Sequence, residues 1–119
     1  MTRIVGIVLV RNEDRFVRQA VENSRPFCDE MLLVDNGSTD GTPAILESLA
    51  AKDPRASLHS IRHPAESHDL LKKFVGTRTW VFAVDGDEIY DPHGLEKFRS
   101  MVTRGDFQSH WMVLGNVLH

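Results

Sequence analysis

The chain is organised around Thr79-Trp80-Val81-Phe82-Ala83-Val84-Asp85-Gly86-Asp87-Glu88-Ile89, where an uninterrupted apolar run ends at three acids. The five residues from Trp80 to Val84 are all apolar, with no alternation of polar and apolar side chains. This pattern predicts a strand that is covered on both faces and is therefore central in an α/β sheet. Sheets of this class bind their ligands beyond the carboxyl ends of the strands. The acids are therefore expected at a ligand-binding edge.

The two aspartates of this stretch form a D-x-D pattern that suits a metal ion. Gly86 separates Asp85 from Asp87, and its missing side chain leaves room for a phosphate and lets both carboxylates face one site. Carboxylate oxygens suit Mg²⁺ or Mn²⁺, which takes one or two of them and completes its shell with water and substrate phosphates. The spacing predicts a divalent-metal site at Asp87 and Asp85, with a solvated acidic turn as the alternative for a D-x-D pattern taken alone.

Length and composition indicate one ordinary globular domain. The chain has 119 residues, of which 41% are hydrophobic and 26% are charged. A formal net charge of −3 argues against nucleic-acid binding driven by phosphate neutralisation. The single cysteine, Cys28, excludes an internal disulfide and fits a reducing compartment. The apolar run from Ile4 to Val10 is too short to span a bilayer, so we expect a cytoplasmic protein without a membrane span.

Strand and helix patterns alternate along the whole sequence. Apolar stripes at helical spacing separate the expected strands, which are Ile4–Val10, Met31–Val34, Ala56–Arg62, Trp80–Val84 and Trp111–Leu114. This βαβαβαβαβ order predicts a three-layer α/β/α sandwich with a mostly parallel sheet and right-handed crossovers. The turn after the first strand contains neither a dinucleotide-binding fingerprint nor a P-loop, so any nucleotide must be held differently.

The turn after the second strand carries another acid. Asn36-Gly37 would suggest a β-hairpin, but apolar residues at helical spacing follow from Ala44 to Ala50, so the turn leads from a strand into a helix. Asp35 is therefore expected at the same sheet edge as Asp85. An acid in this place can accept hydrogen bonds from a base N–H group or from ribose hydroxyls. A helix-entry cap is the alternative role for Asp35.

Three segments together resemble the N-terminal half of family 2 glycosyltransferases of GT-A fold. They are Asn12-Glu13, Val34-Asp35-Asn36-Gly37-Ser38-Thr39-Asp40-Gly41-Thr42 and Val84-Asp85-Gly86-Asp87-Glu88, in this order, and the resemblance covers roughly residues 3–100. It implies transfer of a sugar from a nucleotide-diphosphate donor, usually with inversion and with a divalent metal. By position, Asp35 would contact the base or ribose, Asp85 the ribose or the donor sugar, and Asp87 the metal.

The expected nucleotide-sugar site extends beyond these three acids. Arg11 and Arg78 are the cations best placed in sequence to assist a diphosphate, although Arg78 precedes the D-x-D strand and enters at its far end. The full expected set is Arg11, Asn12, Glu13, Asp35, Asn36, Gly37, Arg78, Asp85 and Gly86, with Asp87 and Asp85 at the metal, Mn²⁺ or Mg²⁺. A UDP-sugar is the expected donor, and the sequence does not specify the acceptor.

The resemblance also implies that the site is incomplete. The catalytic base of the family lies in the acceptor half, beyond the fifth strand, whereas this sequence ends at His119. We therefore expect residues 1–119 to be a single donor-binding domain truncated at its C-terminus, without its catalytic base. The apolar strand Trp111–Leu114 would then be uncovered, which predicts self-association.

Two other functions remain open from the sequence. In a phosphotransferase of haloacid dehalogenase type, Asp85 would be a nucleophile and Asp87 an acid/base. That class places D-x-D on its opening strand, whereas three strands are expected before it here. The other alternative is a non-catalytic module that binds nucleotide sugars.

Overall fold

Four parallel strands form the centre of the structure, a computed structural model that describes residues 2–107. The strand order is β3-β2-β1-β4, so β1 and β2 are internal. The strands are β1 (Arg3–Val10), β2 (Glu30–Asn36), β3 (Ala56–Ile61) and β4 (Thr79–Asp85). The parallel sheet expected from the alternating pattern is thus confirmed for these strands. The expected strand Trp111–Leu114 lies outside the described residues.

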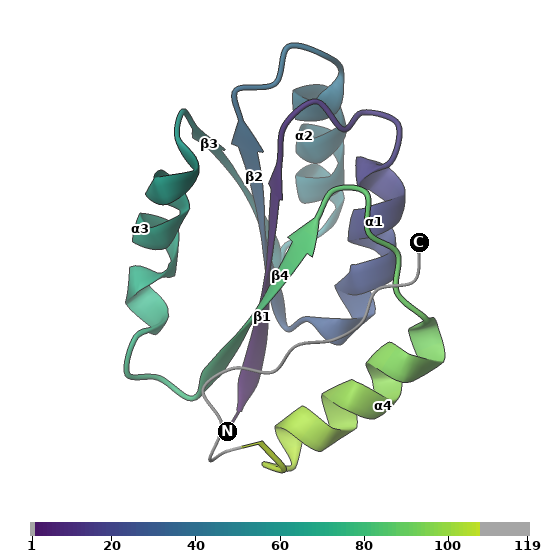
Figure 1. Ribbon diagram of the computed structural model, residues 1–119, viewed down its shortest axis with the longest axis vertical. Coiled ribbons are helices and arrows are strands. Elements are labelled where there is room, and N and C mark those ends of the chain that lie inside the picture. Colours follow the sequence, from purple (N-terminus) through teal and green to yellow (C-terminus); the bar gives the residue numbers. More distant parts are fainter. Residues whose placement is uncertain (1, 108–119) are drawn as a thin grey trace.

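Helices cover both faces of this sheet (Figure 1). The α-helices are α1 (Val17–Ser24), α2 (Thr42–Lys52), α3 (Ser67–Leu71) and α4 (Pro92–Thr103), and the short 3₁₀ turns are Arg25–Phe27, Pro64–Glu66 and Lys72–Phe74. Figure 1 shows α3 on one side of the sheet and α1, α2 and α4 on the other. The layer order is therefore helix, sheet, helix, as the sequence predicts.

Two hydrophobic clusters hold these layers together. The larger one combines alternate side chains of β1 and β2, such as Val8 and Leu33, with residues of α1, α2 and α4. The smaller one lies under α3 and contains the intervening side chains, such as Ile7 and Val34. Because β1 and β2 bury both faces, their sequences are continuous apolar runs.

The strand β4 lies at one end of the described sheet. Its apolar run predicts a central strand, but in the described part of the chain β4 is an edge strand that pairs only with β1. Trp80 and Phe82 pack on the larger cluster, whereas Val81 on the opposite face is 41% exposed. Because the expected fifth strand, Trp111–Leu114, lies outside the described residues, the central position of β4 stays a prediction.

Candidate functional site

The carboxyl ends of β1, β2 and β4 bring the predicted site residues to one edge of the sheet. In the parallel register, Asp35 of β2 lies beside Val10, and Asp85 of β4 lies beside Leu9. The two acids therefore flank the end of β1 on its two sides. The loops that follow these strands leave the sheet at the same edge, which is the upper edge in Figure 1.

Hydrogen bonds join the loop after β1 to the loop after β2. The backbone N–H of Asn12 donates to Ser38 Oγ at 2.9 Å, and the Thr39 N–H donates to Asn12 Oδ1 at 2.8 Å. The N–H of Glu13 donates to Oγ1 of the buried Thr42 at 2.9 Å. Asn12 has a φ of 54°, a left-handed conformation that asparagine tolerates better than most residues. The two loops thus form one surface, although 26 to 29 residues separate the bonded partners.

Asp35 offers an acceptor atom that the described protein does not use. Its side chain is buried, and Oδ2 accepts a hydrogen bond from the Ser38 N–H at 3.2 Å. Within residues 2–107, Oδ1 of Asp35 is buried and has no hydrogen-bond partner. Burying an unpaired acceptor is unfavourable, by about 1–3 kcal/mol. A ligand with an N–H or O–H group at this edge would remove that penalty.

Asn36 and Gly37 continue the strand into the turn. Oδ1 of Asn36 is likewise buried without a partner among the described residues. Because consecutive residues of a strand point to opposite faces, Asn36 lies on the α3 side and Asp35 on the side of α1 and α2. Gly37 has a φ of 71°, which favours glycine and lets the chain leave β2 toward α2.

The loop after β4 packs closely on the loop after β1. Gly86 is buried, and a Cβ atom on it would lie 2.4 Å from Val10 Cγ1 and 3.2 Å from Glu13 Cβ. Only glycine permits this approach without a shift of one of the two loops. Asp85 and Asp87, on either side of Gly86, are exposed. The glycine of the D-x-D pattern therefore allows the backbone between the two aspartates to pack against the end of β1.

Negative charge accumulates at this edge. Burial raises the pKa of Glu13 above its ordinary value, and the charges of Asp87, Asp40 and Asp85 raise it further. The Asp87 carboxylate forms no hydrogen bond or ion pair within the described residues. A bound cation would relieve this repulsion, so the donor set fits a divalent metal.

The same residues do not form a closed metal cage. Among residues 2–107, no group of three or more His, Cys, Asp or Glu side chains is arranged to hold a metal ion. Mg²⁺ and Mn²⁺ in nucleotide sites typically use only one or two protein carboxylates, with phosphates and water as the other ligands. An open pair such as Asp85 and Asp87 is compatible with that mode of binding and not with a structural metal.

Arg78 is not part of this edge. It lies directly before β4, and its carbonyl accepts a hydrogen bond from the Arg3 N–H at the amino edge of the sheet, at 2.9 Å. The seven residues of β4 then separate it from the D-x-D turn. The expectation that Arg78 assists the site is therefore not supported by its position. Arg11, directly after β1, is at the carboxyl edge and exposed.

Three residues near the D-x-D turn received no structural role in the sequence analysis. Asn23 of α1 forms two hydrogen bonds with the backbone of Tyr90, and the Glu88 side chain accepts one from the backbone of Asp85. The position of Glu88, three residues after the end of the strand, is the sequence feature that could have indicated this contact. No local pattern indicates the contact of Asn23, because 67 residues separate it from Tyr90.

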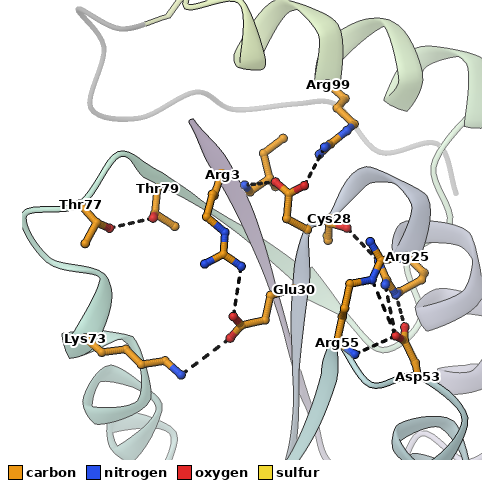
Figure 2. Close-up of polar contacts among 12 residues, drawn as sticks. Arg3, Arg25, Cys28, Glu30, Asp53, Arg55, Lys73, Thr77, Thr79 and Arg99 are labelled. Atoms are coloured by element: carbon orange, nitrogen blue, oxygen red, sulfur yellow. Dashed lines mark hydrogen bonds and ion pairs between the residues drawn. The ribbon is translucent and has the colours of Figure 1, made fainter. Parts of the chain in front are cut away.

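A hollow of about 590 Å³ lies at the opposite, amino edge of the sheet, beside Arg3, Asp29 and Arg99. Three of its charged side chains are already paired: Arg99 binds Asp29 at 2.7 Å, and Arg3 lies 3.4 Å from Glu30. Figure 2 shows these ion pairs together with Lys73 and Glu30. No buried side-chain polar atom of this hollow lacks a partner in the described structure. Its size alone does not make it a better candidate than the carboxyl edge.

Residues 7–113 match the family model described as glycosyl transferase family 2. The chain belongs to this family. The resemblance of its motifs is thereby confirmed, and the D-x-D turn and the loops after β1 and β2 all lie within the matched range.

Curated family 2 relatives are longer than this chain. It is 28% identical over 111 residues to the lipopolysaccharide core biosynthesis glycosyltransferase LpsC of Rhizobium meliloti, covering 91% of this chain and 40% of that protein. It is 32% identical over 89 residues to an uncharacterized glycosyltransferase of Rickettsia conorii, covering 72% of this chain and 29% of that protein. The chain thus spans less than half the length of these relatives.

A solved structure supports the fold of this family 2 chain. The mannosyltransferase PcManGT of Pyrobaculum calidifontis, determined in complex with GDP-Man and Mn²⁺, superposes with a TM-score of 0.61 at 21% sequence identity. The match covers 83% of this chain and 32% of the mannosyltransferase. The expected GT-A type of α/β fold is confirmed, and the described residues correspond to part of such a domain. No helix within residues 2–107 is both long and apolar enough to cross a bilayer.

Proposed function

We propose that this chain is the donor-binding part of a glycosyltransferase that transfers a sugar from a nucleotide-diphosphate donor to an acceptor, with inversion. Membership of glycosyl transferase family 2 supports the reaction class. The observation that carries the location is the buried, unpartnered Oδ1 of Asp35 at the edge where the acids of β4 also gather. An unused acceptor beside exposed carboxylates suits a ligand with a hydrogen-bonding nucleoside and a charged diphosphate.

In this proposal, Asp35 binds the nucleoside and accepts a hydrogen bond from the base or the ribose. Asn36 and Gly37 follow Asp35 at the same edge and contribute to the nucleotide-sugar site, and Asn12 holds the loop after β2 in place through its hydrogen bonds. Arg11 and Glu13 lie where β1 ends, close to the turn that contains Gly86. Asp85 contacts the ribose or the donor sugar.

We further propose that Asp87, assisted by Asp85, holds Mn²⁺ or Mg²⁺ together with the donor diphosphate. When bound, the metal would neutralise the charge that develops on the diphosphate leaving group. The protein contributes the position of the backbone between the two aspartates, where Gly86 packs on Val10. The repulsion that raises the pKa of Glu13 supports a cation at this place.

A uridine nucleotide is our proposed donor, and guanosine is the competing base. The mannosyltransferase with the similar fold was solved with GDP-Man. Both bases present an N–H group that a carboxylate acceptor such as Asp35 can bind. Titration with UDP and GDP in parallel distinguishes them.

The proposed domain is residues 1–119, with the acceptor-binding part and the catalytic base outside this sequence. The isolated chain should then bind donor nucleotide weakly, transfer no sugar at a measurable rate and self-associate through apolar residues such as those of the expected strand Trp111–Leu114. Light scattering and a transfer assay test this directly. Robust turnover by a monodisperse monomer would show instead that the site is complete.

We also propose a cytoplasmic location for the protein, which its single cysteine, Cys28, supports.

The decisive experiment is calorimetric titration of the purified chain with UDP and GDP, in Mn²⁺ and then in EDTA. We expect metal-dependent binding that Asp35→Asn and Asp87→Asn weaken, whereas Glu47→Gln on the exposed surface of α2 leaves it unchanged. Binding that is equal in Mn²⁺ and EDTA would contradict the metal model. Cleavage of a generic aryl phosphate, lost in Asp85→Asn, would favour a phosphotransferase. Binding by the full-length protein without transfer would favour a non-catalytic module.

A further inference from the structure

The turn after β4 is closed by reciprocal hydrogen bonds between its first and fourth residues. The backbone N–H of Asp85 donates to Oε1 of Glu88 at 2.9 Å, and the N–H of Glu88 donates to the carbonyl of Asp85 at 3.1 Å. The Glu88 side chain is therefore folded back over the turn that contains both aspartates. Its carboxylate accepts an N–H that would otherwise point outward from the edge strand.

A second set of contacts ties the end of this turn to α1. The side-chain amide of Asn23 donates to the carbonyl of Tyr90 at 2.8 Å and accepts from the Tyr90 N–H at 2.7 Å. This two-bond pairing satisfies both polar atoms of the asparagine and resembles the pairing of neighbouring strands. The ring of Tyr90 also packs on Phe82 of β4, with centroids 5.2 Å apart. The residues that follow the D-x-D pattern are therefore attached to two elements of the core.

The Tyr90 side chain also lies close to the Glu88 carboxylate. Burial raises the pKa of Tyr90 to about 12, and the charges of Glu88 and Asp85 and a hydrogen bond to Glu88 contribute to the shift. A phenol is protonated at neutral pH with or without this shift, so its O–H can donate to Glu88. Together with the Gly86 contact on Val10, these interactions hold the turn at its start, middle and end.

We propose that Glu88 is a positioning residue, whose carboxylate fixes the backbone between Asp85 and Asp87 while Asn23 ties the turn to α1. The turn is then formed before any cation or nucleotide binds. This inference rests on the proposed function of the carboxyl edge as a nucleotide-sugar site. It assigns Glu88 the role of accepting the Asp85 N–H through Oε1, and neither proton transfer nor metal binding.

Glutamine at position 88 separates this role from the others. A side-chain amide keeps a carbonyl oxygen that can accept the Asp85 N–H, but it can neither accept a proton as a base nor supply a charged metal ligand. Alanine removes the acceptor altogether. A positioning role therefore predicts that Glu88→Gln retains the behaviour of the wild type, whereas a base or a metal ligand predicts that both variants fail.

Two measurements on the full 119-residue chain test the proposal. The first is the rate of hydrogen exchange at the Asp85 amide, measured by NMR in the presence of EDTA. This measurement requires neither metal nor nucleotide. We expect Glu88→Ala to lower protection of this amide by about tenfold or more, the effect of losing one hydrogen bond to a charged acceptor, and Glu88→Gln to keep most of it. The second is the affinity for UDP in Mn²⁺, which should follow the same order.

Two variants of α1 form a matched pair that tests the contact between Asn23 and Tyr90. Asn23→Ala should loosen the turn and lower UDP affinity in Mn²⁺, whereas Gln19→Ala, which removes an exposed side chain from the same helix, should not. Thermal unfolding confirms that each variant is folded. If Asn23→Ala is unfolded, Asn23→Asp, which keeps the acceptor for the Tyr90 N–H, replaces it.

The proposal is overturned if Glu88→Ala leaves Asp85 exchange unchanged, or if exchange accelerates without any loss of UDP affinity. It is also overturned if Glu88→Gln keeps the amide protected but loses Mn²⁺-dependent affinity as fully as alanine does. Failure of the wild-type chain to bind either UDP or GDP would instead contradict the proposed function. In that case the hydrogen-exchange measurement at Asp85 still decides whether Glu88 orders the turn.

Discussion

The acidic side chains at the two edges of the sheet differ in whether they form ion pairs. At the amino edge, Glu30 lies 3.4 Å from Arg3 and 3.7 Å from Lys73, and Asp29 binds Arg99 at 2.7 Å (Figure 2). At the carboxyl edge, the acids of the turns after β1, β2 and β4 form no ion pair within the described residues. Both edges contain acids, but only one of them also supplies the cations that neutralise them.

One acid at each edge, Asp29 and Glu13, shows the same difference in the direction of its pKa shift. Asp29 has a lowered pKa despite its partial burial, because Arg99 and the Ile4 N–H stabilise its charged form. Glu13 has a raised pKa, because burial and three neighbouring acids destabilise its charged form. The amino edge is therefore organised for stability of the fold, and the carboxyl edge retains an unfavourable arrangement that a cationic ligand would relieve.

The largest expected effect on UDP affinity comes from replacing an aspartate by asparagine at the carboxyl edge, with the same replacement at the amino edge as its control. Asp87→Asn should lower UDP affinity in Mn²⁺ by about 100-fold, since loss of residues that merely support metal ligands costs 10–100-fold. Asp29→Asn, the same chemical change at the amino edge, should leave this affinity unchanged. Calorimetry measures both. Equal losses in the two variants would remove the distinction between the edges.

The next effect concerns the nucleoside. Asp35→Ala should weaken binding of uridine and of UDP by a similar factor, about 1–3 kcal/mol for loss of a buried polar contact. The reason is that Asp35 would bind the base or ribose and not the diphosphate. Weakening of UDP alone would place Asp35 at the metal or the phosphates instead.

The third prediction tests the contact between the loops after β1 and β4. Gly86→Ala should destabilise the protein by about 1–3 kcal/mol, because the added Cβ would overlap Val10 in a closely packed place. Gly41→Ala is the matched control, since its Cβ would meet Asp14 at an ordinary 3.6 Å. Urea unfolding of both variants decides this, and similar midpoints would show that the loop after β4 can move away at little cost.

The structural features that these experiments test were not equally predictable from the sequence. Periodicity located every strand and helix from Arg3 to Thr103, and strand ends correctly brought Asp35 and Asp85 to one edge. The contact of Asn23 with Tyr90 could not be predicted, because it joins segments that are distant in the sequence. The position of Arg78 at the far end of β4, in contrast, follows from the sequence alone, because Arg78 directly precedes the strand.

The smallest effect should be the pH dependence of the amino edge. The pKa of Asp29 is lower in the folded protein than the ordinary value of 3.8. The unfolded chain therefore binds more protons in this range, so stability from Asp29 is full above the unfolded pKa and is lost as pH falls through the folded value. We expect a contribution of about 1 kcal/mol at most, because the ion pair with Arg99 is partly exposed to solvent.

Urea unfolding of the wild type and Asp29→Asn between pH 2.5 and 7, with about half-unit steps, measures this contribution against the linkage relation. The stability difference between the two proteins should be constant above pH about 5 and should shrink as the carboxyl group is protonated. Arg99→Ala should remove most of the same difference, since Arg99 provides the hydrogen bond that lowers the pKa. A difference between wild type and Asp29→Asn that stays constant down to pH 2.5 would mean that the hydrogen bond to the Ile4 N–H, and not the charge, is what Asp29 contributes.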